Sequence, residues 1–177
     1  MLQTLGVYYP AIIVKDMDES IMFYRRLGMQ LLYKEPNRDD PESVIAMLAT
    51  GDASTMLQLV GPTHGEVEIA EGALGVGSMQ YLTFHVSREQ MDAMFSELSS
   101  AGVHGSEVID RGYERLVFME DPNGVLVVLI VWATEPPPGM SRGAVLARAG
   151  QIRDAAGDTY VEDVHVQQAI ADLAAVR

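Results

Sequence analysis

The chain has few side chains that can carry a proton near neutral pH, because it contains four histidines and no cysteine. His85 lies in a short apolar run with alternating polar residues, whereas His64, His104 and His165 lie in segments typical of loops or of a tail. Imidazole is the natural proton carrier at this pH, and a tyrosine or a carboxylate beside an arginine can assist it. If the protein is an enzyme, the candidate catalytic residues are His85, Tyr81 and Glu114.

Each candidate also has a purely structural interpretation. A histidine on a half-buried strand is commonly a hydrogen-bonded wall residue. Glu114 belongs to a Tyr-Glu-Arg cluster at 113–115, which also fits a surface turn with a local ion pair. The absence of cysteine excludes disulfides and thiol chemistry, and no His-Glu-x-x-His pattern or close histidine pair indicates a metal site.

The elements that would position these residues come from a duplicated pattern. Each copy begins with strand-like alternation and changes to helical spacing, and Asp16 or Ser87 stands where a helix cap is needed, three residues before Glu or Gln. Gly28 and Gly102 then end the helices. Each half is therefore predicted to be β-α-β-β-β. The later strands are expected at residues 29–34, 44–49 and 55–60, and at 103–109, 115–120 and 125–132.

Two such units, together with specific residues around the first helix and before the last strand, resemble the vicinal oxygen chelate superfamily. That group includes glyoxalase I, extradiol dioxygenases, fosfomycin-modifying enzymes and bleomycin resistance proteins. The resemblance implies an α+β fold for residues 1–134, in which two βαβββ modules, about 5–62 and 77–134, form a curved mixed sheet. The matching residues are Asp16, Ser20, Phe23, Tyr24, Leu27 and Gly28, with Asp121, Pro122, Asn123 and Gly124.

The metal that enzymes of this group hold is not expected here. The resemblance places its ligand positions at Tyr9, Gln58, Tyr81 and Val128. Divalent metals prefer imidazole, carboxylate or thiolate ligands, and valine has no donor atom. We therefore expect no metal and no other cofactor. The alternative is a displaced site in which His85 and a tyrosinate bind a metal.

The resemblance also implies a cleft between the modules, and strand alternation indicates which side chains would line it. They are mostly apolar or aromatic, which suits a hydrophobic or flat aromatic small molecule oriented by a few polar groups. The alternative is that the tyrosines fill an inactive barrel. The expected ligand-binding residues are Tyr9, Ile13, Met56, Gln58, Tyr81, Thr83, His85, Val128 and Ile130.

Two classes of function follow from this. The preferred one is a metal-independent, small-molecule binding protein of the bleomycin-resistance type, which holds a drug or natural product without changing it. The alternative is a metal-free isomerase, cyclase or hydrolase that uses the acid–base residues above. A third reading is a divergent metal-dependent lyase or dioxygenase with other ligands.

Composition restricts the partners. The chain carries 12 basic and 25 acidic residues, and this net charge of −13 argues against nucleic acid. No apolar run reaches membrane-spanning length and no signal-peptide pattern opens the chain, so we expect a cytoplasmic protein without a membrane partner. The resemblance implies a homodimer.

The last part of the chain, residues 135–177, lies outside the family pattern. Three successive prolines at 136–138 predict a stiff spacer. Two short amphipathic helices are expected after it, at 141–156 and 160–176. Their apolar faces are too narrow to fold alone, so they should dock on the preceding domain or on a second subunit.

Overall fold

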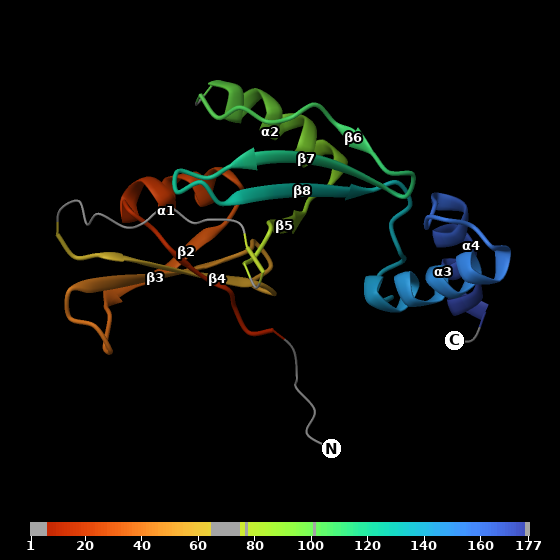
Figure 1. Cartoon of the computed structure of the whole chain (residues 1–177), viewed down its shortest axis with the longest axis horizontal. Coiled ribbons are helices and arrows are strands. Elements are labelled where there is room, and N and C mark those ends of the chain that lie inside the picture. Colours follow the sequence, from red (N-terminus) through yellow and green to blue (C-terminus); the bar gives the residue numbers. More distant parts are fainter. Residues whose placement is uncertain (1–6, 65–74, 77, 101, 176–177) are drawn as a thin grey trace, which may run out of the picture. The chain divides into compact units, whose positions relative to one another are not determined.

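The computed structural model describes residues 7–64, 75–76, 78–100 and 102–175 (Figure 1). Its elements follow the order β-α-β-β-β twice and end in two helices. Within the described residues no helix combines the length and the apolar character needed to cross a membrane. The α+β fold with two βαβββ modules and a helical C-terminal extension, predicted above, is confirmed.

The first module forms one mixed sheet, named sheet A, with the strand order β1-β4-β3-β2. Strands β1 and β4 are parallel, whereas β3 pairs antiparallel with both β4 and β2. A register shift between Leu31 and Tyr33 interrupts the pairing of β2 with β3. The elements are β1 (Ala11–Ile13), α1 (Met17–Arg26), β2 (Gln30–Pro36), β3 (Ser43–Ala49) and β4 (Met56–Pro62).

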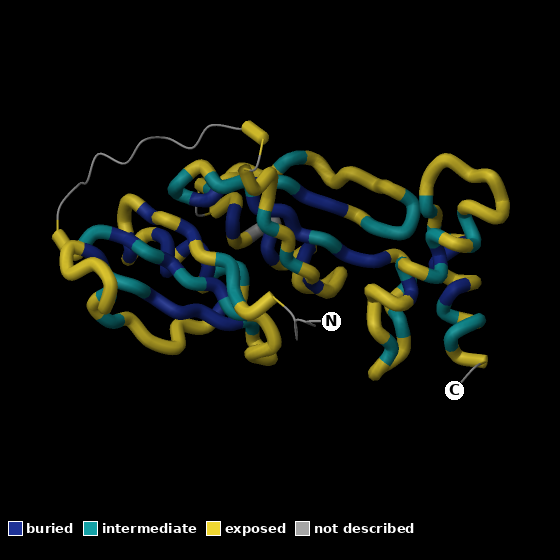
Figure 2. The backbone as a smooth tube through the Cα atoms, turned by 60° about the horizontal axis from the view of Figure 1, so that its bottom comes forward, coloured by how far each residue is buried: buried dark blue, intermediate teal, exposed yellow. Residues whose placement is uncertain are grey.

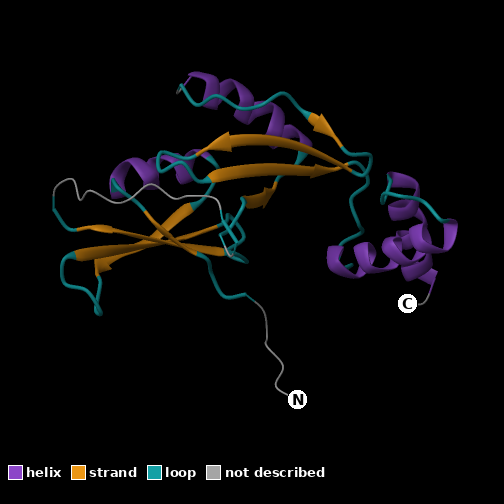
Figure 3. Cartoon of the chain, viewed as in Figure 1, coloured by secondary structure: helices purple, strands orange, loops and turns teal. Residues whose placement is uncertain are grey.

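The second module repeats this arrangement in sheet B, whose strand order is β5-β8-β7-β6 (Figure 3). The position of each strand in sheet B matches that of its counterpart in sheet A, so the duplication seen in the sequence is also a duplication of topology. The elements are β5 (Leu82–His85), α2 (Arg88–Ser100), β6 (Ile109–Asp110), β7 (Glu114–Glu120) and β8 (Leu126–Trp132).

Both predicted helix starts are confirmed. The Asp16 carboxylate accepts the backbone N–H of Glu19 at 2.8 Å. At α2, Ser87 Oγ accepts the backbone N–H of Gln90 at 3.2 Å, while the Gln90 side chain accepts the N–H of Ser87 at 2.8 Å. These reciprocal bonds satisfy N–H groups that a helix leaves unpaired at its first turn.

The strand expected at 103–109 is much shorter than predicted. Only Ile109 and Asp110 pair regularly with β7, and Gly105 forms an isolated bridge with Met119. Between them, the Ser106 N–H donates to the Phe118 carbonyl at 2.8 Å, while the Phe118 N–H donates to the Ser106 hydroxyl at 3.0 Å. A side chain thus takes the place of one backbone acceptor, and regular pairing stops there.

Burial alternates along β1 and β4 and so separates a buried face of sheet A from a more exposed one, whereas β2 is exposed along most of its length (Figure 2). Ile12, Leu57 and Leu59 are buried, and helix α1 lies against β2, β3 and β4. Phe23 and Tyr24 of α1 are also buried, with their rings edge to face at 5.2 Å between centroids. Full burial of one such apolar side chain stabilises the fold by about 1.5–3 kcal/mol.

The C-terminal extension forms α3 (Arg142–Ala156) and α4 (Asp163–Ala175), one turn shorter at the start of α4 than expected. Both helices pack against the end of β8 in one cluster, whose partly buried rim includes Tyr113. A Cβ on Gly112 would lie 1.9 Å from Glu162 Oε2, so the chain approaches this glycine closely. The buried members of the cluster are Trp132, Val145, Ala149, Val166 and Ala169.

Contacts group the chain into two compact units. The first unit comprises residues 1–82, 94–104 and 120–126, and it contains sheet A and α1. The second unit comprises residues 83–93, 105–119 and 127–177, and it contains most of sheet B with α3 and α4.

Candidate functional site

The residues that carry the family pattern form a buried joint in the first unit. The Tyr24 hydroxyl donates to Asp121 Oδ2 at 3.0 Å, and Asn123 Nδ2 donates to the Ser20 hydroxyl at 3.0 Å. Asn123 Oδ1 also accepts the backbone N–H of Lys15 at 3.0 Å. These bonds connect the turn before β8 to helix α1.

Burial in this joint raises the pKa of the Tyr24 phenol far above its ordinary value, and the Asp121 carboxylate adds to the effect. Tyr24, Ser20 and Asp121 are all buried. Their polar groups form hydrogen bonds within the joint. These motif residues therefore stabilise the fold and offer no reactive group to a ligand.

Sheet A has a partly exposed, largely apolar face. It lies opposite the face on which Leu57 and Leu59 are buried. Directly paired residues of neighbouring strands share a face of a sheet. One row across this face runs through residues that pair in turn, Ala11 with Gln58, Gln58 with Met47 and Met47 with Tyr33. A second row contains Ile13, Val60, Ile45 and Glu35.

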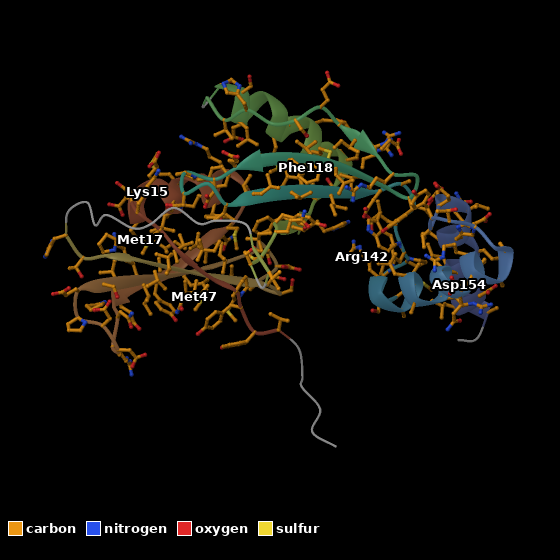
Figure 4. All side chains as sticks on the ribbon, viewed as in Figure 1. Lys15, Met17, Met47, Phe118, Arg142 and Asp154 are labelled. Atoms are coloured by element: carbon orange, nitrogen blue, oxygen red, sulfur yellow. The ribbon has the colours of Figure 1, made fainter. Side chains whose placement is uncertain are left out.

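The exposure of these side chains differs along the rows. Ile13 is 66% exposed and Tyr33 44% exposed, while Gln58 is partly exposed. Met47, which is labelled in Figure 4, is buried in the sheet. Among the residues that the structure describes, the Gln58 amide has no hydrogen-bond partner. The face therefore combines apolar surface with one free amide near its middle.

The remaining predicted residues of the first unit lie beside or near this face. Met56 follows the same alternation as Gln58 and is partly exposed. Tyr9 precedes β1, is half-buried and contacts Tyr8 with ring centroids 5.0 Å apart. Tyr81, just before β5, is 40% exposed. Their contact with a ligand stays a prediction.

In the second unit, the predicted residues divide by exposure. Thr83 and His85 are exposed and alternate with less exposed neighbours on β5, so they share one face of the strand. Their contact with a ligand stays a prediction. Ile130 is partly buried and packs against the cluster that holds the extension. Val128 is fully buried and offers no exposed surface. Whether Val128 and Ile130 contact a ligand is untested.

His85 has a partner that the sequence did not indicate. Its Nε2 lies 2.7 Å from Glu135 Oε1, and the other oxygen of the same carboxylate accepts a hydrogen bond from Arg142 Nη2 at 2.8 Å. Burial acts to raise the pKa of the Glu135 carboxyl, but the hydrogen bonds from Arg142 and His85 outweigh it, so that pKa lies below its ordinary value. Glu135 stands in the proline-rich spacer, where no periodic pattern marks it.

Arg142 also contacts the ring of Trp132. Its guanidinium carbon lies 5.8 Å from the ring centroid, within the range of a cation–π contact. The Tyr113 ring meets the same indole edge to face at 5.7 Å. The contact with Trp132 limits the movement of the arginine head group, and Tyr113 packs against the same indole.

Glu114 has a different environment from the one expected for a catalytic assistant. Its carboxylate is only 12% exposed and lies 3.8 Å from Arg111 Nη1. The neighbouring Arg115 pairs with Asp110 at 3.2 Å. The structure thus gives His85 the carboxylate of Glu135 as its partner, and Glu114 belongs to a local ion-pair group.

The side chains present do not suit the metal that the resemblance implies. In the first unit, the ligand positions hold two phenols, Tyr9 and Tyr81, and the Gln58 amide, and in the second unit Val128 has no donor atom. Within the described ranges, no group of three or more His, Cys, Asp or Glu side chains is gathered in a way that fits a metal ion.

Comparison with known proteins agrees with this fold. Residues 6–129 match the family model described as Glyoxalase/Bleomycin resistance protein/Dioxygenase superfamily. No curated protein matches the chain in sequence.

Three solved structures illustrate the likeness. A glyoxalase family protein from Bacillus cereus is 20% identical, with a TM-score of 0.60 over 75% of this chain and 97% of that chain. A glyoxylase/bleomycin resistance protein/dioxygenase domain from Frankia sp. EAN1pec is 15% identical, with a TM-score of 0.61 over 73% and 99%. A variant of the fosfomycin resistance protein FosX from Listeria monocytogenes, complexed with Mn(II) and a dihydroxypropylphosphonic acid, is 15% identical, with a TM-score of 0.56 over 75% and 95%.

Proposed function

The chain belongs to the glyoxalase/bleomycin resistance protein/dioxygenase superfamily, and on this basis we propose that it binds a small, mostly apolar or aromatic molecule without a metal ion. The ligand lies against the open face of sheet A, next to Ile13, Gln58 and Tyr33. The resemblance to bleomycin resistance proteins supports a role in holding a drug or natural product unchanged.

One observation carries this proposal. Gln58, which has no partner among the described residues, stands in a row with Ala11, Met47 and the aromatic Tyr33. Ile13, in the neighbouring row of the same face, is 66% exposed. Covering such surface is favourable by about 25 cal/mol per Å² of apolar area. A free amide in the same place lets the ligand form a directed hydrogen bond, which sets its orientation.

Metal independence is supported by the donor types at the implied ligand positions. An amide and a valine replace the groups that a divalent ion prefers. Binding should therefore be the same after treatment with EDTA and after addition of Mn²⁺ or Zn²⁺.

The test uses the uncharged aromatic dye Nile red, whose fluorescence rises in apolar surroundings. Ile13→Asp places a charge in the proposed contact and should weaken dye binding about tenfold. The matched control is Val164→Asp on α4, because Val164 is also 66% exposed. Equal effects of the two variants, or no dye binding by the wild type, would contradict the proposed face.

A second candidate function is metal-free acid–base catalysis, and the His85–Glu135 contact favours it. This site lies in the second unit and is argued in the next subsection. The homodimer implied by the family resemblance stays a prediction, which analytical ultracentrifugation would check.

A further inference from the structure

We infer that the C-terminal extension builds, around His85, a proton-transfer site for a small carboxylate-bearing molecule. Glu135 is the positioning residue that holds the imidazole, and Arg142 binds the carboxylate of the molecule. Both residues lie beyond the family match, which ends at residue 129. This site is independent of the ligand proposed for sheet A.

The first step of the argument is the geometry around Glu135. Its two oxygens serve two different partners, His85 Nε2 at 2.7 Å and Arg142 Nη2 at 2.8 Å. A charged carboxylate only accepts hydrogen bonds, so the neutral imidazole carries its proton on Nε2. The lone pair of His85 therefore sits on Nδ1.

Nδ1 is available to a ligand. Among the described residues it has no hydrogen-bond partner, and the His85 side chain is 35% exposed. A carboxylate that fixes the tautomer and stabilises the imidazolium is the general arrangement of a histidine base.

The second step concerns Arg142. Its Nη2 binds Glu135 and its guanidinium plane is restrained by Trp132, yet the side chain remains 46% exposed. Nε and Nη1 have no partner among the described residues. An arginine that is held in place and keeps free donors is well suited to bind a carboxylate.

The third step separates this role from a merely structural one. The extension is already fixed to sheet B by a buried apolar cluster around Trp132 and Val166. Ion pairs as exposed as Glu135–Arg142 add little to stability. A three-residue chain of a histidine, a carboxylate and an arginine is therefore not needed to hold the helices.

The chemistry that follows is a reversible proton transfer. Nδ1 takes a proton from a C–H or O–H group next to the bound carboxylate, and the electron pair of that bond stays on the substrate. Return of the proton from the imidazolium to the same or a neighbouring atom of the substrate completes the step without another reactant. Isomerisation of a small organic acid is the reaction class that this fits.

The experiment uses the full chain labelled with ¹⁵N at histidine, and benzoate as the carboxylate probe. Long-range ¹H–¹⁵N spectra should show His85 with its proton on Nε2, and Glu135→Gln should remove this preference. Benzoate should shift the His85 signals, and Arg142→Gln should weaken that response about tenfold. Arg142→Lys keeps the positive charge and should retain part of the benzoate response. This second variant keeps the test decisive if Arg142→Gln disturbs the packing of the extension.

The matched control is Arg148→Gln, because Arg148 also lies on α3, pairs with a carboxylate (Asp172) and is 43% exposed. It should leave the benzoate response unchanged. The inference would be overturned by a proton on Nδ1 in the wild type, or by equal benzoate binding in the wild type and in Arg142→Gln. Neither result bears on Nile red binding, so the two proposals fail separately.

Discussion

The Tyr24 hydroxyl donates a 3.0 Å hydrogen bond to Asp121, which lies 97 positions later in the chain. The pair joins α1 to the turn before β8. Asp121 Oδ1 meanwhile accepts the backbone N–H groups of Asn123 and Val125, each at 2.8 Å. The most recognisable residues of the family pattern thus stabilise the joint between α1 and the turn before β8.

Tyr24→Phe should reduce the free energy of unfolding by about 1–3 kcal/mol, because it removes a donor from a buried carboxylate. Urea denaturation followed by circular dichroism measures this. Tyr8→Phe is the control, since Tyr8 is 76% exposed. A loss of Nile red binding by folded Tyr24→Phe protein would show that the junction has a role beyond stability.

Stability should fall steeply at alkaline pH. The pKa of Tyr24 is raised above its ordinary value of 10.0 in the fold, so the unfolded chain loses this proton first as the pH rises. The stabilising contribution is complete below pH 10 and declines above it, by up to about 1.4 kcal/mol per pH unit. In Tyr24→Phe the decline should be shallower, and an identical slope in both proteins would contradict this account.

Acid should change the surroundings of Trp132 without releasing the extension, because the buried apolar cluster holds the helices in place. The pKa of Glu135 lies below its ordinary value of 4.5 in the fold, so its contribution is present above that value and is lost as the pH falls further. The chain has a single tryptophan, Trp132, at the docking cluster, and its emission should shift in this range. Glu135→Gln should remove that part of the change, whereas Glu120→Gln should not.

Gly112→Ala should cost somewhat more stability than a glycine-to-alanine change in open space, because the end of the Glu162 side chain must move away. The glycine has a φ of +80°, which costs about 1 kcal/mol for alanine, and its Cβ would meet the Glu162 carboxylate. Gly28→Ala is the matched control, with a φ of +85° and open space around it. Thermal denaturation should show a larger loss at Gly112, partly recovered by adding Glu162→Ala; equal losses at the two glycines would argue against a steric contact.

Metal analysis tests the proposed independence from metal directly. Protein purified without a tag or chelator should contain little metal, with or without added Zn²⁺, Ni²⁺, Mn²⁺ or Fe²⁺. Stoichiometric bound metal would instead support the divergent lyase or dioxygenase reading, and would require ligands other than Gln58 and Val128.

Local patterns predicted what depends on neighbours in the sequence. Asp16 and Ser87 correctly predicted the two helix starts, because a capping bond needs only a residue three positions away. Strand parity predicted that Ile13 and Gln58 share one face of sheet A, since alternation follows from backbone geometry alone. That this face contacts a ligand stays a prediction.

Contacts between residues far apart in the sequence could not be predicted, because no local pattern links the two partners. His85 and Glu135 are 50 positions apart, and the glutamate lies among prolines without any period. The role of Tyr24 was likewise hidden, because its partner is in the other half of the sequence. Ser106 could not be foreseen either, since a serine in an apolar run resembles an ordinary exposed strand residue.

The replacement of a backbone acceptor by the Ser106 hydroxyl has a consequence for self-association. A long, regular outer strand offers a row of free N–H and C=O groups on which another chain can add its own strand. At this border of sheet B the regular pairing spans only Ile109 and Asp110, and a carboxylate stands at its end. A second molecule therefore finds too short a template to extend the sheet, which protects this border from fibril-like growth at high protein concentration.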